Sequence, residues 1–261
     1  MRILQVDPTL VVKQRQRMKM WKNKFDGRCF CVGNGPSLRN TPLHLLENKY
    51  TFGLNRVAKI YPFTSWRPTF YVNVTVATAD EGWRDSAKEA IVDTPSFVGY
   101  GTLPHLLEAK GTVLSIPHHV FPLWVSDDVP RQEYPDPNIW SHDVSRNISK
   151  YGSSMLAVMQ IAVYLGFKEL IMVGCDMGWR PFDYEEDKDP NHFTEDYWGK
   201  MNLSGQEIIV TPELAQRYTD DARSGHVLAK KVCDKLGVKI YNATMGGELE
   251  VYPRVDLLEV I

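Results

Sequence analysis

Residues 153–176 read SSMLAVMQIAVYLGFKELIMVGCD, and this stretch decides the fold. Its first half, Ser153–Leu165, is apolar on nearly every face, which predicts a buried helix that ends at Gly166. Its second half, Glu169–Val173, is a short apolar run that predicts a central strand closing on Gly174-Cys175-Asp176. A buried helix leading into a buried strand is typical of a parallel sheet that helices cover on both faces.

Outside this stretch, strand and helix patterns alternate along the chain. Strands are predicted at Cys29–Val32, Tyr50–Leu54, Thr69–Val74, Ser96–Tyr100, Thr112–Ile116 and Lys239–Tyr241, and helices after Thr41-Pro42, near Ser86–Val92 and after Thr211-Pro212. Two irregular, aromatic-rich segments, 117–147 and 177–210, interrupt the alternation, and we expect them to be ordered loops that act as lids. The sequence therefore predicts an α/β fold: a doubly wound, mostly parallel, Rossmann-like sheet in a single domain with lid-like loops.

The start of the chain differs from the rest in character. Between Thr9 and Phe25, apolar residues mix with six basic ones: Lys13, Arg15, Arg17, Lys19, Lys22 and Lys24. We expect residues 1–27 to form a peripheral amphipathic helix, and residues 28–261 to form a Rossmann-like nucleotide-binding catalytic domain. The helix either packs as an arm with a solvated basic face or makes a peripheral membrane contact through that face.

Composition excludes several classes of function. The 30 Lys and Arg residues against 32 Asp and Glu residues give a net charge of −2, which provides no global positive field to hold a nucleic acid. The longest apolar stretch, Met155–Leu165, is shorter than the ~20 residues of a membrane-spanning helix, and the N-terminus lacks a long apolar signal core. We therefore expect a cytoplasmic protein without a transmembrane segment. Four cysteines are too few for a disulfide scaffold, so we expect them to be reduced and buried.

A glycine turn follows the first predicted strand of the sheet. Gly33-Asn34-Gly35-Pro36-Ser37 joins this strand to a helix, an arrangement that lets backbone N–H groups approach phosphate oxygens. Leu38 stands where the dinucleotide fingerprint has its third glycine, and the Gly-Lys-Ser/Thr of a Walker loop is absent. Spacing alone leaves two interpretations open, a nucleotide-binding turn and a plain tight turn between a strand and a helix.

Asp176 and His192 are the candidate catalytic residues. Asp176 follows a predicted strand, so its carboxylate should project at the sheet edge where ligands of open α/β sheets bind. His192 lies in the adjoining loop, and sharing that loop with Asp176 and Arg180 favours it over the other histidines. The rivals are His118, His119 and His226. The acidic run at 185–189 is most simply a solvated turn, and its spacing matches no calcium loop.

Several motifs, in one order, resemble a known group of proteins. They are GNGPSL from Gly33, TFGLNR from Thr51, YGSSMLAVMQIAVYLGFKELIMVGCDM from Tyr151, NHF-x3-Y ending at Tyr197, and IYNAT-x-GGELEVYPRV from Ile240. Over most of the chain from Arg28 to Val255, the sequence is similar to the MptE-like group. That group is related to bacterial sialyltransferases of the lipooligosaccharide type and to flagellin nonulosonate transferases. It also includes an archaeal 6-hydroxymethylpterin pyrophosphokinase.

The resemblance implies a nucleotide site and a general base. The implied nucleotide-binding residues are Gly33, Asn34, Gly35, Pro36, Ser37, Asn55, Ser153 and Ser154. The glycine turn would cradle the phosphates, Asn55 would meet the nucleotide from the next strand end, and the two serines would present hydroxyl and N–H groups. The related sialyltransferases use a histidine to deprotonate the acceptor hydroxyl, and loop position assigns that role to His192.

The resulting hypothesis is a sugar-nucleotide-dependent glycosyltransferase with a CMP-activated donor. Its partners would be the nucleotide-sugar donor and a glycan or small-molecule acceptor, with no obligatory cofactor and no metal site, because CMP carries one phosphate. One alternative is an MptE-like ATP-dependent pyrophosphokinase acting on a small hydroxymethyl compound, with Mg²⁺ held by Asp176 and Asp80. Another is a non-catalytic nucleotide-binding protein.

Overall fold

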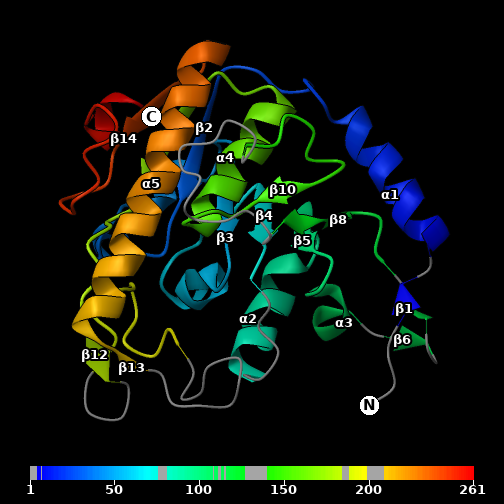
Figure 1. The fold of residues 1–261 in the computed structure, drawn as a ribbon, viewed down its shortest axis with the longest axis horizontal. Coiled ribbons are helices and arrows are strands. Elements are labelled where there is room, and N and C mark those ends of the chain that lie inside the picture. The colour runs from blue at the N-terminus through cyan, green and yellow to red at the C-terminus, as the bar shows by residue number, and fades with distance from the viewer. Residues whose placement is uncertain are drawn as a thin grey trace.

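Seven parallel strands build the central sheet, in the order β14-β11-β2-β3-β4-β5-β8 (Figure 1). Their bounds are β2 (Arg28–Val32), β3 (Thr51–Leu54), β4 (Phe70–Asn73), β5 (Ser96–Gly99), β8 (Val120–Leu123), β11 (Glu169–Val173) and β14 (Lys239–Asn242). The computed structural model describes residues 5–6, 8–75, 81–107, 109–110, 113–114, 116–126, 140–183, 188–198 and 209–261. β11 pairs with β2 residue for residue, so the two strands end level at Val173 and Val32.

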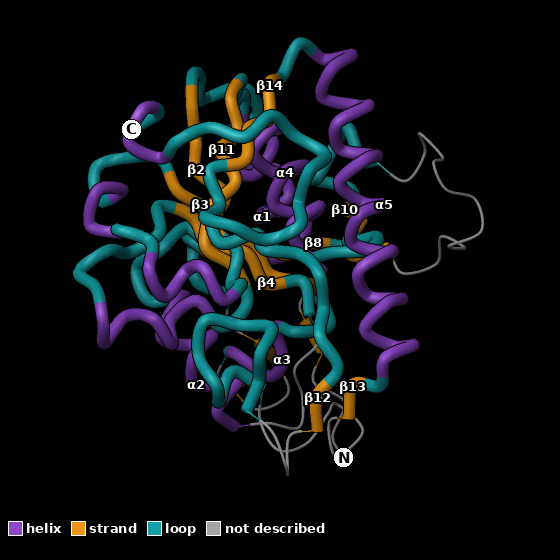
Figure 2. Tube along the Cα trace, turned by 90° about the vertical axis from the view of Figure 1, so that its left-hand side faces the viewer, coloured by secondary structure: helices purple, strands orange, loops and turns teal. Residues whose placement is uncertain are grey.

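Helices cover both faces of this sheet. The α-helices are α1 (Pro8–Met20), α2 (Glu81–Ile91), α3 (Leu103–Leu106), α4 (Ser154–Leu165) and α5 (Pro212–Leu236). One apolar cluster joins α1, α4 and α5 to one face, and a second joins α2 and α3 to the other (Figure 2). Along β2, Cys29 and Cys31 enter the first cluster while Phe30 and Val32 enter the second, as a strand buried on both faces requires. The fold is therefore the predicted α/β, Rossmann-like domain.

The helices that flank the site begin and end where the sequence predicted. Ser153 caps α4 by accepting a hydrogen bond from the Met155 N–H at 3.2 Å, and Gly166 ends the helix with φ of 116°. Thr211 caps α5 by accepting from the Leu214 N–H at 3.2 Å. These caps fix the start of α4 against the ends of the central strands, where the site lies.

Three local predictions are wrong. The segment after Pro42 is not an α-helix, because two proline-started turns form the short 3-10 helices η1 (Pro36–Asn40) and η2 (Leu43–Leu46) instead. The strand expected at 112–116 is the two-residue β7 (Val113–Leu114), which pairs with β1 (Gln5–Val6) and β6 (Ala109–Lys110) outside the central sheet. The place beside β5 belongs to β8, inside a segment expected to be irregular.

Pro122 explains why β8 was missed. A proline removes a ladder hydrogen bond and so indicates a loop, but it is tolerated on an edge strand. The N–H groups of Ser96 and Tyr100 donate to the carbonyls of His119 and Leu123, so residue 122 directs its backbone away from β5. Its missing N–H therefore interrupts no bond of the sheet. β9 (Val125–Ser126) pairs with β10 (Ile148–Ser149), and β12 (Phe182–Asp183) pairs with β13 (Ile209–Val210).

Other expectations have mixed outcomes. Cys29, Cys31 and Cys233 are buried, Cys175 is partly buried, and all four are free thiols, as predicted. Much of the two expected lids, at 127–139, 184–187 and 199–208, lies outside the described residues, and the domain division at residue 27 stays a prediction. Within the described part of the chain, no helix combines the length and the apolar character needed to cross a bilayer.

Candidate functional site

The site lies where the chain changes direction across the sheet. From β2 the chain proceeds to β3, β4 and β5 on one side, whereas from β11 it proceeds to β14 on the other. Neighbouring strands whose connections diverge leave a crevice beyond their carboxyl ends, and this is where open α/β sheets bind ligands. Here the crevice opens between the turn after Val32 and the turn after Val173.

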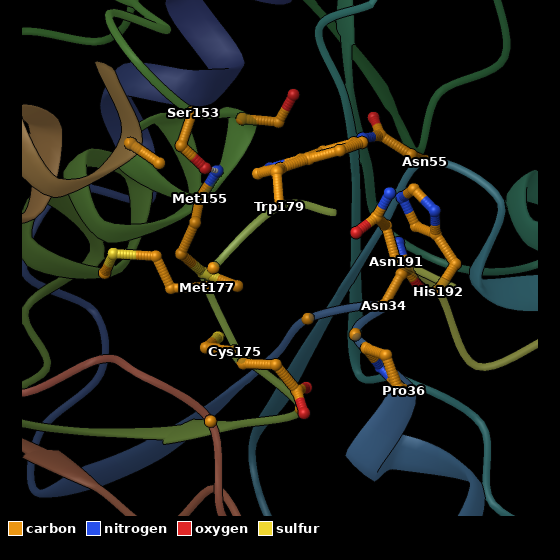
Figure 3. Close-up of a pocket in the computed structure, with 18 of the residues that line it drawn as sticks. Asn34, Pro36, Asn55, Ser153, Met155, Cys175, Met177, Trp179, Asn191 and His192 are labelled. Carbon is orange, nitrogen blue, oxygen red and sulfur yellow. Dashed lines mark hydrogen bonds between the residues drawn. The ribbon is translucent and has the colours of Figure 1, made fainter. Parts of the chain in front are cut away.

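The crevice contains a cavity of about 520 Å³. All but one of the predicted site residues line it: Gly33, Asn34, Gly35, Pro36, Asn55, Ser153, Ser154, Asp176 and His192. Figure 3 shows Ser153 and Met177 on one side of the cavity, and Asn55 and His192 on the other. The fold therefore brings nine predicted residues from five separate segments of the chain to one cavity.

The exception is Ser37, which faces Asp176 rather than the cavity. Its N–H donates to Asp176 Oδ1 at 3.1 Å and its hydroxyl donates to Asp176 Oδ2 at 2.7 Å. Burial raises the pKa of the Asp176 carboxyl above its ordinary value, while the Ser37 hydrogen bonds and the nearby His192 lower it. A carboxylate thus occupies the N-terminal end of η1, where the family resemblance implied a phosphate.

The glycines of the turn make room for the neighbouring strand end. A Cβ on Gly35 would lie 2.0 Å from Asp176 Oδ2, and one on Gly33 would lie 2.4 Å from the Gly174 carbonyl oxygen. Neither glycine has a positive φ, so close approach rather than backbone conformation requires them. The GNG turn is therefore fitted to Asp176.

Polar groups gather at the start of α4. The hydroxyl of Thr75 lies 3.4 Å from the Ser154 hydroxyl and 3.5 Å from Asn55 Oδ1. The Ser154 N–H has no hydrogen-bond acceptor among the described residues, and it stands at the positive end of a 12-residue helix. Asn55 reaches this place with a φ of 51°, a left-handed conformation that asparagine tolerates better than most residues.

His192 is held by a buried carboxylate. Its Nδ1 lies 2.7 Å from Asp189 Oδ2, and the Asp189 side chain is fully buried. The second oxygen of Asp189 accepts the Asn191 N–H at 2.8 Å, which fixes the carboxylate within the loop. The imidazole is 10% exposed and lines the cavity. With Nδ1 facing a carboxylate, that nitrogen carries the proton, and Nε2 is the free base of the neutral ring.

Aromatic rings fix the plane of this imidazole. The Tyr197 ring stacks on it with 3.8 Å between centroids and 2° between planes, and the Trp179 ring meets it edge-on at 5.3 Å. Tyr197 is itself anchored, because its hydroxyl accepts from Asn34 Nδ2 at 2.9 Å and its carbonyl accepts from the buried Arg56 guanidinium. Burial raises the pKa of the Tyr197 hydroxyl, so it stays protonated.

Similarity to known proteins is confined to solved structures. No family model matches the sequence, and no curated protein matches it. The chain is similar to the MAf glycosyltransferase from Magnetospirillum magneticum AMB-1, with 12% identity and a TM-score of 0.47 over 95% of this chain. It spans 38% of the length of that enzyme.

Two structures of one sialyltransferase are also similar. CstII from Campylobacter jejuni, in complex with the substrate analogue cytidine-5'-monophosphate, shares 12% identity at a TM-score of 0.38, covering 87% of this chain and 84% of that one. The sialyltransferase CST-II in complex with a trisaccharide acceptor and CMP shares 11% identity at a TM-score of 0.37, covering 87% and 85%. These three structures leave the resemblance to the MptE-like group untested. At these values the likeness concerns the fold alone, and the function proposed below rests on the residues of this chain.

The rival histidines occupy different places. His118 and His119 directly precede β8, so they lie at the amino ends of the parallel strands, whereas the cavity lies at the carboxyl ends. His119 Nε2 contacts the Ile91 carbonyl oxygen there at 3.1 Å. His226 does line the cavity, from the middle of α5. Its Nδ1 lies 3.0 Å from the Tyr252 hydroxyl, and burial lowers its pKa to about 4, so it is neutral at pH 7.

Asp189 is the residue that sequence reasoning missed. It ends an acidic run and was grouped with a solvated turn, but it is only 3% exposed, so that interpretation is wrong for this residue. The Asp-x-x-His spacing was the available signal, since a turn brings residues three apart together. Asp80, the second carboxylate of the kinase alternative, lies outside the described residues. Within those residues, no three His, Cys, Asp or Glu side chains gather as metal ligands.

Proposed function

We propose that this protein is a glycosyltransferase that moves a sugar from a nucleotide donor to an acceptor hydroxyl, with His192 as general base. One observation carries the proposal: a histidine paired with a buried carboxylate faces a cavity at the switch point of a Rossmann-like sheet. A base of this kind suits the deprotonation of a hydroxyl, which is the proton transfer that glycosyl transfer to a hydroxyl requires.

In the proposed reaction, His192 Nε2 accepts the proton of the acceptor hydroxyl as its oxygen attacks the anomeric carbon. The bond from that carbon to the donor phosphate oxygen breaks, and the nucleotide leaves with the electron pair. Asp189 keeps the proton on Nδ1 and stabilises the imidazolium that forms. The stacked Tyr197 holds the plane of the imidazole at the cavity wall.

The leaving phosphate is assigned to the start of α4 rather than to the glycine turn. The Ser37 groups already serve Asp176, whose negative charge disfavours a second anion beside it. The Ser154 N–H and hydroxyl, the Thr75 hydroxyl and the positive end of α4 offer donors without a nearby carboxylate partner. Arg180 lines the same cavity and adds a guanidinium.

This arrangement and the sequence resemblance both support a CMP-activated donor. A CMP-activated sugar leaves as a monophosphate, so the few donors at the start of α4 suit its single developing charge. Pyrophosphoryl transfer from ATP would need Asp176 as a metal ligand, but no three His, Cys, Asp or Glu side chains of the described residues are grouped so as to share a metal ion. The glycosyltransferase is therefore the function that these residues support best.

Ligand-dependent thermal unfolding tests the proposal. We expect CMP to raise the melting temperature more than UDP, GDP or ATP with Mg²⁺, because a ligand stabilises the state that binds it. The full chain incubated with CMP-N-acetylneuraminate should then release CMP, by transfer or by hydrolysis. Selective stabilisation by ATP with Mg²⁺ would favour the pyrophosphokinase, and stabilisation by CMP without any CMP release would favour a binding protein.

A further inference from the structure

The outward face of α1 combines basic and apolar side chains. The helix packs on the sheet edge at β8 through Gln14 and Met18, which are 4% and 0% exposed. The residues on its other face are spaced three and four apart and are all exposed: Val12, Lys13, Gln16, Lys19 and Met20. Val12 and Met20 are 53% and 68% exposed, large values for apolar side chains. Figure 1 shows this helix at the periphery of the molecule.

The segment is also uniformly positive. Residues 8–25 contain six Lys and Arg residues and no Asp or Glu, although the whole chain has a net charge of −2. Within the described part of the chain, none of the six side chains pairs with an acid. Three of them lie over aromatic rings instead, among them Arg15 at 5.3 Å from the centroid of Trp124. This positive charge is therefore available to an external partner.

Trp124 extends the same surface from the sheet edge. It follows β8 directly, is 45% exposed, and lies beside Arg15. Tryptophan is enriched at membrane–water interfaces, because one part of the indole is apolar and its N–H is polar. The surface therefore has the three components that an interfacial helix uses: basic side chains for lipid headgroups, apolar side chains for the acyl boundary, and an aromatic residue between them.

We propose that this surface, formed by the outward face of α1 and Trp124, binds an anionic lipid bilayer. Charge alone would also suit a nucleic acid, but phosphate backbones offer nothing to exposed side chains such as Val12 and Met20. A bilayer takes up both, since lysines reach the headgroups while apolar side chains enter below them. The inference does not depend on the proposed transferase activity. α1 packs on β8, whereas the strand ends that line the cavity come no nearer to it than β4, two strands away.

Vesicle flotation of the full chain tests this inference. We expect the protein to float with vesicles of phosphatidylcholine and phosphatidylglycerol, to stay unbound with phosphatidylcholine alone, and to dissociate at high salt. Lys13→Glu with Lys19→Glu should weaken binding by at least about 10-fold. Val12→Ser with Met20→Ser should weaken it by roughly 5-fold without any change of charge.

A matched control lies on α5. Lys231→Glu with Lys235→Glu makes the same charge change at exposed positions of another helix, and should leave binding within about 2-fold of the wild type. Equal loss in both lysine pairs, or equal flotation with both kinds of vesicle, would refute the assignment. If the variant with Val12→Ser and Met20→Ser bound vesicles as strongly as the wild type, and short duplex DNA competed with that binding, the surface would be a nucleic-acid surface instead. Should a variant not fold, the wild-type protein still tests the proposal, because its failure to float with the phosphatidylglycerol vesicles would refute it.

Discussion

Two histidines face one cavity from different surroundings. His192 stands in the segment between β12 and β13, with a buried carboxylate at 2.7 Å and a tyrosine ring against its face. His226 stands within α5, with a tyrosine hydroxyl at 3.0 Å and apolar groups around it. Only the first has a partner that stabilises its protonated form, whereas burial alone acts on the second. The carboxylate partner, which His226 lacks, is thus the reason for proposing His192 rather than His226 as the general base.

Removal of His192 should have the largest effect. We expect His192→Ala to lower CMP release from the sugar donor by about 10²–10⁴-fold, the range for loss of a positioned base. CMP affinity, followed by thermal shift, should change little, because the base touches the acceptor. The same substitution at His119, on the far sheet edge, serves as the control. A larger loss in His226→Ala than in His192→Ala would reverse the comparison.

Loss of the carboxylate partner should come next. Asp189→Asn keeps the shape and one hydrogen bond but removes the charge, so we expect a fall in turnover of roughly 10–10²-fold. The loss should fall on kcat and leave CMP affinity nearly unchanged, because the charge of Asp189 acts on the imidazolium that forms during the reaction. A merely structural role would lower CMP affinity as well. Asp189→Glu tests for recovery by a restored carboxylate.

His226 should affect the pH dependence of the free energy of unfolding rather than turnover. In the folded protein its pKa is about 4, whereas in the unfolded chain it lies near the ordinary 6.5. The unfolded state therefore binds more protons between pH 6.5 and 4, and the free energy of unfolding falls as the pH decreases through this window. The shift corresponds to roughly 3 kcal/mol. From pH 6.5 to 4, the free energy of unfolding measured with urea should fall by about this amount more in the wild type than in His226→Asn. Parallel slopes would contradict the assignment.

The smallest effect is expected at Tyr197. Tyr197→Phe keeps the ring that stacks on His192 and removes only the hydroxyl that accepts from Asn34. Turnover should fall less than about 5-fold, while the free energy of unfolding should fall by about 1–2 kcal/mol, because a buried donor loses its acceptor. Tyr197→Leu also removes the stacked ring, so it should lower turnover further than Tyr197→Phe does. Equal activity in the two variants would show that stacking does not position the base.

The sequence predicted the fold where local pattern and tertiary environment agree. Runs such as Glu169–Val173 are apolar in sequence and buried on both faces in the structure, so their composition alone indicates a central strand. β8 was missed because edge strands tolerate proline and local pattern does not reveal which strand is at the edge.

For the candidate site, the positions of the residues could be predicted from local pattern, but their roles could not. The residues after the strand ends were found because parallel strands bring their carboxyl ends together. The roles within it were harder to predict, because they depend on contacts between distant segments. Ser37 and Asp176 are 139 residues apart in the sequence, and only the folded chain shows that they form a hydrogen bond. Asp189 was hidden by its acidic neighbours, since composition predicts solvation and cannot show which carboxylate turns inward.

Pro122 has a consequence for how copies of this protein meet. An exposed strand edge is a template on which another chain can extend the sheet, and this is a common route to aggregation. At β8 the outer edge lacks the N–H of Pro122, and at the other end of the sheet Asn242 of β14 forms a bridge to Arg254. Both ends of the sheet thereby discourage an eighth strand. Self-association of the folded protein, where it occurs, should proceed through helical surfaces and leave the sheet at seven strands.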